Sequence, residues 1–307
     1  MKTTTTRASS FRREKQQTLN TGNRRAGQTV LRWLLQGILA VYAVIVIYPL
    51  FWVAIASFKT STEISQNPWG LPSELRWVNY ITAWKGDPSG GDVGLASAFM
   101  NSVLVTTISL AFILLIGAMA AYVLARFVFT GSGILYNVFL FGMMFPVFLG
   151  IIPLYLLLNS VGLLNSFPGL ILVYVAYSLS FTIFIMTGFF KTLPGELAEA
   201  GAIDGCSHFG VFWKIMLPLA RPGLITAGIF NAFGLWNEYP LALVLLTDTQ
   251  KMTLPLAIAS MAQKQHYQTD WGALFAGLVI VLVPTLIGYI FYQRRITEGL
   301  TAGAIKG

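Results

Sequence analysis

The sequence predicts an all-α polytopic membrane protein with six transmembrane helices and both termini in the cytoplasm. Hydrophobic residues make up 55% of the 307-residue chain and charged residues only 10%, whereas a soluble domain carries about 25% charged residues. Apolar runs long enough to cross a bilayer recur six times. The basic residues gather on alternate sides of these runs.

The six runs each contain roughly the 20 residues that a helix needs to cross the hydrocarbon core. Backbone groups in lipid must be paired within the segment, and the runs do not alternate as barrel strands do, so we expect helices. Gly142, Pro146, Gly150 and Pro153 in the third run and Pro284 in the sixth predict kinks. The runs are 33–58, 102–125, 134–158, 167–190, 224–246 and 272–292.

The basic residues predict the orientation. If the N-terminus is cytoplasmic, 15 of the 20 Lys and Arg residues lie on the cytoplasmic side and five on the other side. Cytoplasmic loops carry such an excess. We therefore expect an outer loop over residues 59–97 and a cytoplasmic loop over residues 191–222.

Residues 1–30 are expected to form a disordered, basic cytoplasmic tail. They hold seven basic residues and one acid, Glu14, among many Ser, Thr, Asn and Gln residues, and such a segment cannot bury a core. A full span follows the charges, so the segment is not a secretory signal. We expect the tail to set orientation and not to bind nucleic acid, with a specific nucleic-acid or lipid site as the alternative.

Few residues are suited to catalysis or metal binding. The chain has one cysteine, Cys206, and two histidines, His208 and His266, so a disulfide, a zinc site and a Ser/His/Asp triad lack residues. An HExxH pattern and paired membrane aspartates are missing from the sequence, which argues against an intramembrane enzyme. The sequence also lacks a GxxxxGK[ST] phosphate loop, so we expect the chain itself to bind no nucleotide and no metal.

The expected outer loop, 59–97, carries Trp69, Trp77 and Trp84 together with three prolines. Aromatic residues at this depth suit the membrane interface. A packed lid and a contact site for an outer partner both fit this composition.

A polar, helix-compatible segment separates the fourth and fifth runs. A helix can start near Leu193-Pro194, because proline is tolerated in the first turn. Gly205 is placed to end that helix, because glycine adopts the left-handed conformation without penalty. Ser207 can then cap a second helix, whose expected apolar stripe is Phe209, Phe212, Trp213 and Met216.

This predicted helix–turn–helix has a face of small residues, formed by Ala200 and Gly201. A small-residue face permits close approach by a partner, and a short helix held in a groove is a common mode of recognition. We therefore interpret the segment as a docking element for a soluble partner. A connector that lies on the lipid surface is the alternative.

The same segment resembles the EAA motif of the membrane subunits of ATP-binding cassette importers. The family pattern runs Glu-Ala-Ala, two residues, Asp-Gly, then Ile-x-Leu-Pro-Leu and a proline. Gly201 replaces the second alanine, and Cys206 stands where alanine is common. The matching residues are Glu199, Ala200, Asp204, Gly205, Ile215, Leu217, Pro218, Leu219 and Pro222.

The resemblance runs from about residue 33 to the end of the chain and points to the carbohydrate-importer branch. The chain is similar to the maltose-type second permease, which implies a type I importer permease fold over residues 31–307. Further matching segments are Asn101-Ser102, Ala120-Ala121-Tyr122, Ile152-Pro153-Leu154-Tyr155, Gly162-Leu163-Leu164-Asn165, Trp236-Asn237-Glu238, Thr253-Leu254-Pro255 and the C-terminal Gly299–Gly307.

The resemblance implies that the 191–222 loop carries the coupling helix, which docks in a cleft of a cytoplasmic ATPase dimer. The ATPase subunits would hold ATP and Mg²⁺. Glu199 would make polar contacts in the cleft, and Asp204 would support the turn. Ala200, Gly201 and Gly205 would allow close packing, and Ile215, Leu217 and Pro218 would tie the second helix to the membrane body.

Two further partners are implied by the resemblance. One is a second, non-identical permease subunit, with a homodimer as the symmetric alternative. The other is an extracytoplasmic sugar-binding protein that delivers the cargo.

Glu238 is the only one of the twelve acids inside a predicted span. A carboxylate at the centre of a membrane helix costs about 2.5–3.5 kcal/mol on insertion scales, and Glu238 would lie roughly 21 Å along the fifth run. Sugars offer hydroxyls to bond and ring faces to stack, so Asn231, Trp236, Asn237 and Glu238 are candidate substrate-path residues. A buried hydrogen bond between helices or to a partner subunit is the alternative.

The predicted function is that of a permease subunit of an ATP-driven importer, which translocates a mono- or oligosaccharide across the cytoplasmic membrane. No Lys or Arg lies within the predicted spans after Arg32, which favours neutral cargo over a glycerol phosphate, although a polyol also fits. A secondary transporter would need ion-coupling acids or broken helices near the midplane. It would also leave the docking element unexplained.

Overall fold

The computed structural model describes residues 5–86, 94–264 and 270–304, and over these residues the secondary structure is helical, without a strand. The chain divides into two compact units, residues 1–55 and 56–307. The first unit consists of helix α1 (Thr5–Ala56), which contains a candidate span over Leu31–Ala56.

Residues 5–30 form the first half of α1, where the sequence predicts a disordered tail. Their many Arg, Lys and Gln residues and their lack of proline are compatible with a helix. A helix without tertiary packing is marginal in water. The disorder of the tail in solution therefore stays a prediction.

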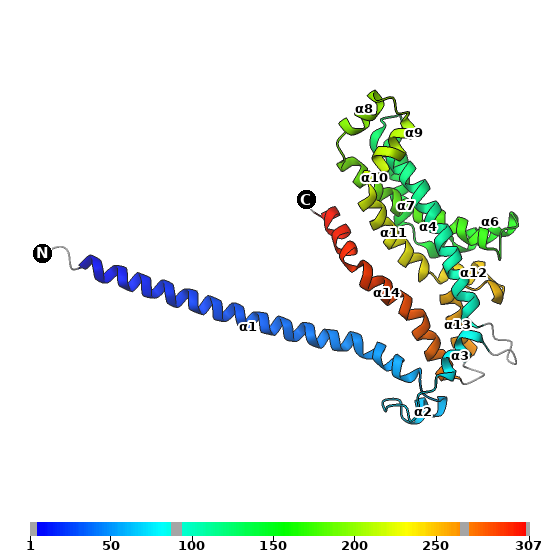
Figure 1. The fold of residues 1–307 in the computed structure, drawn as a ribbon, viewed down its shortest axis with the longest axis horizontal. Coiled ribbons are helices and arrows are strands. Elements are labelled where there is room, and N and C mark those ends of the chain that lie inside the picture. The colour runs from blue at the N-terminus through cyan, green and yellow to red at the C-terminus, as the bar shows by residue number, and fades with distance from the viewer. Residues whose placement is uncertain (1–4, 87–93, 265–269, 305–307) are drawn as a thin grey trace. The chain divides into compact units, whose positions relative to one another are not determined.

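The second unit is organised around α4 (Leu95–Arg126), α7 (Phe167–Thr192), α11 (Arg221–Trp236) and α14 (Trp271–Ala304). Helices α4 and α7 lie side by side, and α11 packs against both of them and against α14 (Figure 1). The α4–α7 approach is close at Gly117, where an added Cβ would lie 2.6 Å from Thr182 Cγ2. Small residues allow such approach between helices in a membrane.

The third apolar run is two helices, α5 (Ser132–Met144) and α6 (Val147–Ser160), which meet at an angle of 102°. The break follows from Pro146, which lacks an N–H and disfavours helical backbone at Phe145 before it. Phe145 has φ −74° and ψ 121°. The predicted kink in this run is thus confirmed, as a full break.

The fifth run is also divided, and the prediction of one continuous span over 224–246 is wrong. Helix α11 ends at Trp236, and α12 (Pro240–Leu245) begins after three non-helical residues. Pro240 explains the break in the same way, since it disfavours helical backbone at Tyr239. Glu238 therefore lies in the break and not within a continuous helix.

Four helices in the described ranges have the length and composition of membrane spans, and up to six spans result if each of two bent pairs is one span. The bent pairs are α5 with α6, and residues 208–219 with α11. The all-helical membrane architecture is confirmed. Six spans and cytoplasmic termini stay predictions.

The described part of the 59–97 loop is a packed structure with two short helices, α2 (Ser61–Gln66) and α3 (Val78–Lys85). The Lys59 side chain is 1% exposed, and its Nζ donates to the Asn67 carbonyl at 2.9 Å and the Pro68 carbonyl at 3.2 Å. Asn79, also buried, donates to the carbonyls of Ser57 and Lys59. This packing agrees with the lid interpretation, while Trp69 and Trp77 remain exposed.

Two short elements complete the unit, a 3₁₀ turn (Thr249–Lys251) and helix α13 (Leu254–Lys264). Helices α3 and α13 lie at one end of α4, and the 191–222 loop lies at the opposite end (Figure 1). The buried residues form three clusters, one at each end of α4 and one near the α12 contact with α6 and α7.

Candidate functional site

The 191–222 loop has the predicted helix–turn–helix form. Helix α8 (Glu196–Ile203) begins two residues after Pro194 and is followed by Asp204 and by Gly205 with φ +83°. Ser207 accepts a hydrogen bond from the Gly210 N–H at 3.1 Å and so caps α9 (His208–Val211). These features confirm the turn glycine and the capping serine.

The second helix of the loop differs from the prediction because it changes pitch. After α9 it continues as a π-helix, η2 (Phe212–Met216), and then as α10 (Leu217–Leu219). The predicted apolar stripe is split. Phe212 and Met216 are buried, whereas Phe209 and Trp213 are exposed and pack on one another with ring centroids 5.9 Å apart.

A hydrophobic cluster joins the second helix to the ends of α4 and α7. The Tyr122 ring of α4 lies 5.5 Å from the Phe190 ring of α7 and 5.2 Å from the Phe212 ring. Ile215 and Leu217 pack against this cluster, as their predicted tie to the membrane body requires. The cluster consists of Ala118, Ala121, Tyr122, Met186, Phe190, Val211, Phe212, Met216 and Ala220.

Gly201 does not face outward, contrary to its predicted role in close packing against a partner. It is buried, and a Cβ at this position would lie 2.4 Å from Ile215 Cδ1. Its small size is therefore used inside the loop, to let α8 approach the second helix. The other small residues of the prediction, Ala200 and Gly205, are exposed.

The exposed surface of α8 and its turn includes Glu199 and Asp204. Pro218 is also exposed, although the sequence predicts that it ties the second helix to the membrane body. Sequence reasoning missed Ile203, whose side chain is 86% exposed at the end of α8. An apolar residue directly before the Asp-Gly turn was the available signal.

Arg126, at the end of α4, is a second residue that sequence reasoning missed. Its Nη2 donates to the Leu193 carbonyl at 2.5 Å, at the junction between α7 and α8. The guanidinium group therefore satisfies a carbonyl at the end of α7. Because α4 and α7 are both fixed to the loop, the loop and these helices form one connected body.

The structure separates the four candidate substrate-path residues. Glu238 Oε1 accepts from the Leu241 N–H at 2.7 Å, and Oε2 accepts from the Ala242 N–H at 3.1 Å and from the Tyr174 hydroxyl at 2.5 Å. The carboxylate thus caps α12 and connects it to α7. This is the interhelical hydrogen bond of the alternative interpretation, and it is partly buried.

Asn231 has a similar bonding role. It is buried, and its Nδ2 donates to Thr182 Oγ1 at 2.9 Å and to the Ala227 carbonyl at 2.8 Å. Asn237 is exposed and donates to the Phe233 carbonyl at the end of α11. Neither amide forms a hydrogen bond with Trp236 among the described contacts.

Asn231 and Glu238 nevertheless share a cavity of about 510 Å³, here called the α7–α11 cavity. Its polar lining includes Tyr174, Tyr177 and Ser178 of α7. Residues from the α5–α6 bend, Met143, Val147 and Phe148, form another wall. The remaining lining residues are Phe181, Phe230, Gly234, Leu235, Pro240 and Leu241.

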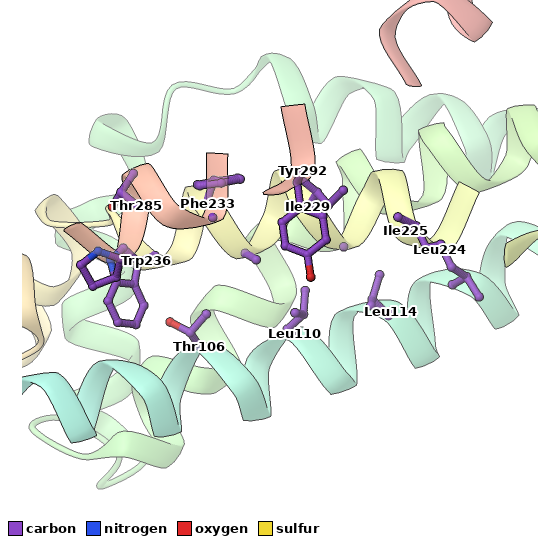
Figure 2. Close-up of a pocket in the computed structure, with 14 residues that line it drawn as sticks. Thr106, Leu110, Leu114, Leu224, Ile225, Ile229, Phe233, Trp236, Thr285 and Tyr292 are labelled. Atoms are coloured by element: carbon purple, nitrogen blue, oxygen red, sulfur yellow. The ribbon is translucent and has the colours of Figure 1, made fainter. Parts of the chain in front are cut away.

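Trp236 lies in a different place, a groove of about 570 Å³ lined by α4, α11 and α14 (Figure 2). Trp236, Thr106 and Thr285 lie toward one end of the groove, and Leu224 and Leu114 toward the other (Figure 2). The Trp236 ring packs edge-on against Phe99 at 5.6 Å. A groove with this apolar lining fits hydrocarbon better than a sugar, which needs many hydrogen bonds.

In the part of the chain that the structure describes, the His, Cys, Asp and Glu residues form no group of three or more that could hold a metal ion.

A family model described as "Binding-protein-dependent transport system inner membrane component" matches residues 113–295. The diacetylchitobiose uptake system permease protein NgcG of Streptomyces coelicolor is 45% identical over 88% of this chain and 87% of that protein. The trehalose transport system permease protein SugB of Mycobacterium tuberculosis is 33% identical over 84% of this chain and 92% of that protein.

The fold also matches a solved structure. A chain in the crystal structure of a bacterial ABC transporter involved in the import of the acidic polysaccharide alginate has a TM-score of 0.72, with 86% of this chain and 96% of that chain covered. The sequence identity is 22%, so this likeness shows the fold alone.

A bundle of membrane-length helices with a helix–turn–helix loop fixed to one end defines a polytopic helical membrane protein. The chain belongs to the family of binding-protein-dependent transport system inner membrane components. It is a multi-pass inner-membrane protein, and the relatives reported above are named as permeases.

Proposed function

We propose that this chain is one of two permease subunits of an ATP-driven importer that brings a sugar into the cytoplasm. A separate ATPase dimer would hold ATP and Mg²⁺ and dock on the 191–222 loop. A second, non-identical permease would complete the path, and an extracytoplasmic binding protein would deliver the sugar.

The observation that carries this proposal is the exposed face of α8 on a loop whose second helix is packed, through Val211, Phe212 and Met216, against α4 and α7. Ile203 presents an apolar tip, with Glu199 and Asp204 beside it in the sequence. Within the described ranges neither carboxylate forms an ion pair. A partner with an apolar pocket and basic groups around it would complement this face.

The connection to the helices supports a mechanical role for the loop. Closure of the ATPase subunits would move α8, and the Tyr122–Phe190–Phe212 contacts and the Arg126–Leu193 bond would carry that motion to α4 and α7. Nucleotide and cargo would shift the equilibrium between inward-facing and outward-facing states through their different affinities for the two.

Orientation is part of the proposal. The 191–222 loop would face the cytoplasm, together with both termini, because 15 of the 20 basic residues then lie inside. Helices α5 and α6 would together form one span and α11 another, with residues 208–219 left in the loop, to make six.

The cargo is proposed to be a neutral mono- or oligosaccharide. The relatives are named for diacetylchitobiose, for trehalose and, in a Halalkalibacterium halodurans protein 33% identical to this chain, for arabinooligosaccharides. The α7–α11 cavity is lined by no Lys or Arg. A polyol is the second candidate, since it offers the same hydroxyl groups. A glycerol phosphate is anionic and would require a basic side chain in the path.

Affinity purification of the tagged chain from mildly solubilised membranes tests the proposal. An ATPase and a second permease should accompany the native chain, and the ATPase should be lost from Gly205→Trp and from Ile203→Glu. Gly162→Trp is the matched control, because Gly162 also has positive φ and open space around it but lies in the α6–α7 connection.

Two results would contradict the proposal. One is a native chain that is purified alone or paired with itself and still transports, which would favour a secondary transporter. The other is retention of the ATPase by both loop variants at the level of the control.

A further inference from the structure

Within the proposed function, we infer that the α7–α11 cavity is this chain's half of the sugar path, that it accepts an uncharged sugar ring, and that Tyr177 is the aromatic platform on which the ring stacks. Tyr177 was not among the four residues that the sequence suggested for the path. Its place in the cavity comes from the fold alone.

Tyr177 differs from its neighbour Tyr174 in the exposure of its side chain and in the hydrogen bonding of its hydroxyl. Tyr174 is buried, and its hydroxyl is committed to Glu238. Tyr177, about one helical turn further along α7, is 54% exposed, and among the described contacts its hydroxyl has no hydrogen-bond partner. A flat apolar face joined to a free hydroxyl matches a sugar, which has an apolar ring face and hydroxyls at its edge.

The cavity has the size and walls of a small-molecule site. Its volume, about 510 Å³, lies within the range of about 300–1,000 Å³ that is usual for ligand pockets. Phe181 and Phe230 meet edge-to-face at 5.8 Å and form one wall. The space next to Gly234 is open, because a Cβ at this position would meet no atom within 4 Å.

The charge of the cavity decides which sugars it admits. Glu238 is the one charged residue among those lining it, and its three hydrogen bonds come from neutral donors. A carboxylate without a neighbouring cation repels anions, more strongly where water is excluded. Uronates and sugar phosphates are therefore disfavoured, and uncharged rings are not.

Thiol labelling tests these points without knowledge of the particular sugar, because the chain has a single cysteine. In a Cys206→Ala background, Tyr177→Cys and Leu172→Cys are compared in permeabilised membranes that contain the full transporter. Leu172 is the matched control, since it lies on the same helix and its side chain is 55% exposed. The probe is a cationic methanethiosulfonate, 2-(trimethylammonium)ethyl methanethiosulfonate.

A thiol in the water-filled path should react at least about tenfold faster than one facing hydrocarbon, because only the thiolate reacts and apolar surroundings suppress it. Equal rates at the two positions would overturn the inference. In the Tyr177→Cys chain, Gly234→Leu should fill the cavity and slow labelling. Gly188→Leu, at another helical glycine with open space, should leave it unchanged.

The charge preference has its own readout. The cationic reagent should modify Tyr177→Cys at least about tenfold faster than the anionic 2-sulfonatoethyl methanethiosulfonate, relative to their rates with a free thiol. Glu238→Gln should bring that ratio close to one, because the amide keeps an acceptor for α12 and loses the charge. An anionic reagent that is equally fast in the native cavity would overturn the preference for uncharged sugars.

Recovery of the ATPase from the same membranes separates this inference from the proposed function. If the ATPase is bound but the Tyr177→Cys thiol does not react, the cavity assignment fails and the coupling function stands. If no ATPase accompanies the native chain, the proposed function fails, whatever the labelling rates are.

Discussion

The Tyr174 hydroxyl of α7 donates a 2.5 Å hydrogen bond to the carboxylate of Glu238, which lies in the break between α11 and α12. The same carboxylate caps α12 through the N–H groups of Leu241 and Ala242. One side chain thus holds a broken membrane helix to its neighbour. The sequence left Glu238 open as a cargo-path residue or as the acceptor of an interhelical hydrogen bond, and the structure shows the hydrogen bond.

A double-mutant cycle on this pair measures the connection. Tyr174→Phe and Glu238→Gln each remove part of the bond, and hydrogen bonds to charged groups contribute about 1.5–3 kcal/mol. We expect a coupling free energy of about 1 kcal/mol or more from unfolding in detergent. Additive effects would mean that the bond does not link α7 to α12. Tyr177→Phe, which leaves this bond intact, is the control.

Arg126→Ala should loosen the junction of α7 and α8. The variant loses the bond to the Leu193 carbonyl, which we expect to raise hydrogen exchange in residues 193–205 by about tenfold, corresponding to about 1.4 kcal/mol. Exchange in the middle of α4 should not change. Lys191→Ala is the control, because Lys191 lies in the last turn of α7 and its Nζ lies 5.3 Å from the centroid of the Tyr136 ring of α5, away from the Leu193 carbonyl. Equal increases in both variants would refute the specific role of Arg126.

Gly201 provides a test of packing inside the loop. Gly201→Ala should be tolerated, since the 2.4 Å contact is with the mobile end of the Ile215 side chain. Gly201→Val should destabilise the loop by about 1–3 kcal/mol through overpacking, and Ile215→Val should restore part of that loss. Apparent melting temperatures in detergent measure these effects. A Gly201→Val variant as stable as the open-space control Gly188→Val would contradict the packing.

Glu63, near the start of the 59–97 loop, should stay ionised in acid. A hydrogen bond from the Ser73 hydroxyl and further bonds from the Thr60 and Ser73 backbone lower its pKa from 4.5 to about 2. A lowered pKa means that the contribution to stability is present above pH 4.5 and is lost as the pH falls toward 2. Titration of the labelled carboxyl by NMR measures this value.

Ser73→Ala is the matched change for that titration. It removes the largest cause of the shift, so the pKa of Glu63 should rise toward its ordinary value. The bonds that the carboxylate accepts from the Thr60 N–H, the Thr60 hydroxyl and the Ser73 N–H should keep it below that value. An unchanged pKa in Ser73→Ala would show that the Ser73 hydroxyl is not the cause.

Local patterns determined much of what could be predicted. Apolar run length and charge bias indicated a helical membrane protein, because lipid enforces backbone pairing within each segment. Gly205 and Ser207 marked the turn and the second helix cap, because these depend on the conformation and side chain of single residues. The EAA-like residues identified the family, which the comparisons confirm.

Tertiary structure decided which side of a helix each residue faces and which segments meet. The space beside Gly201 is filled by the Ile215 side chain of the second helix. Trp236 and Glu238 are two residues apart but line different cavities, because α11 ends at Trp236. Tyr177 and Arg126 acquire their contacts from helices distant in sequence. A linear pattern specifies local conformation, but burial and pairing depend on neighbours that only folding brings together.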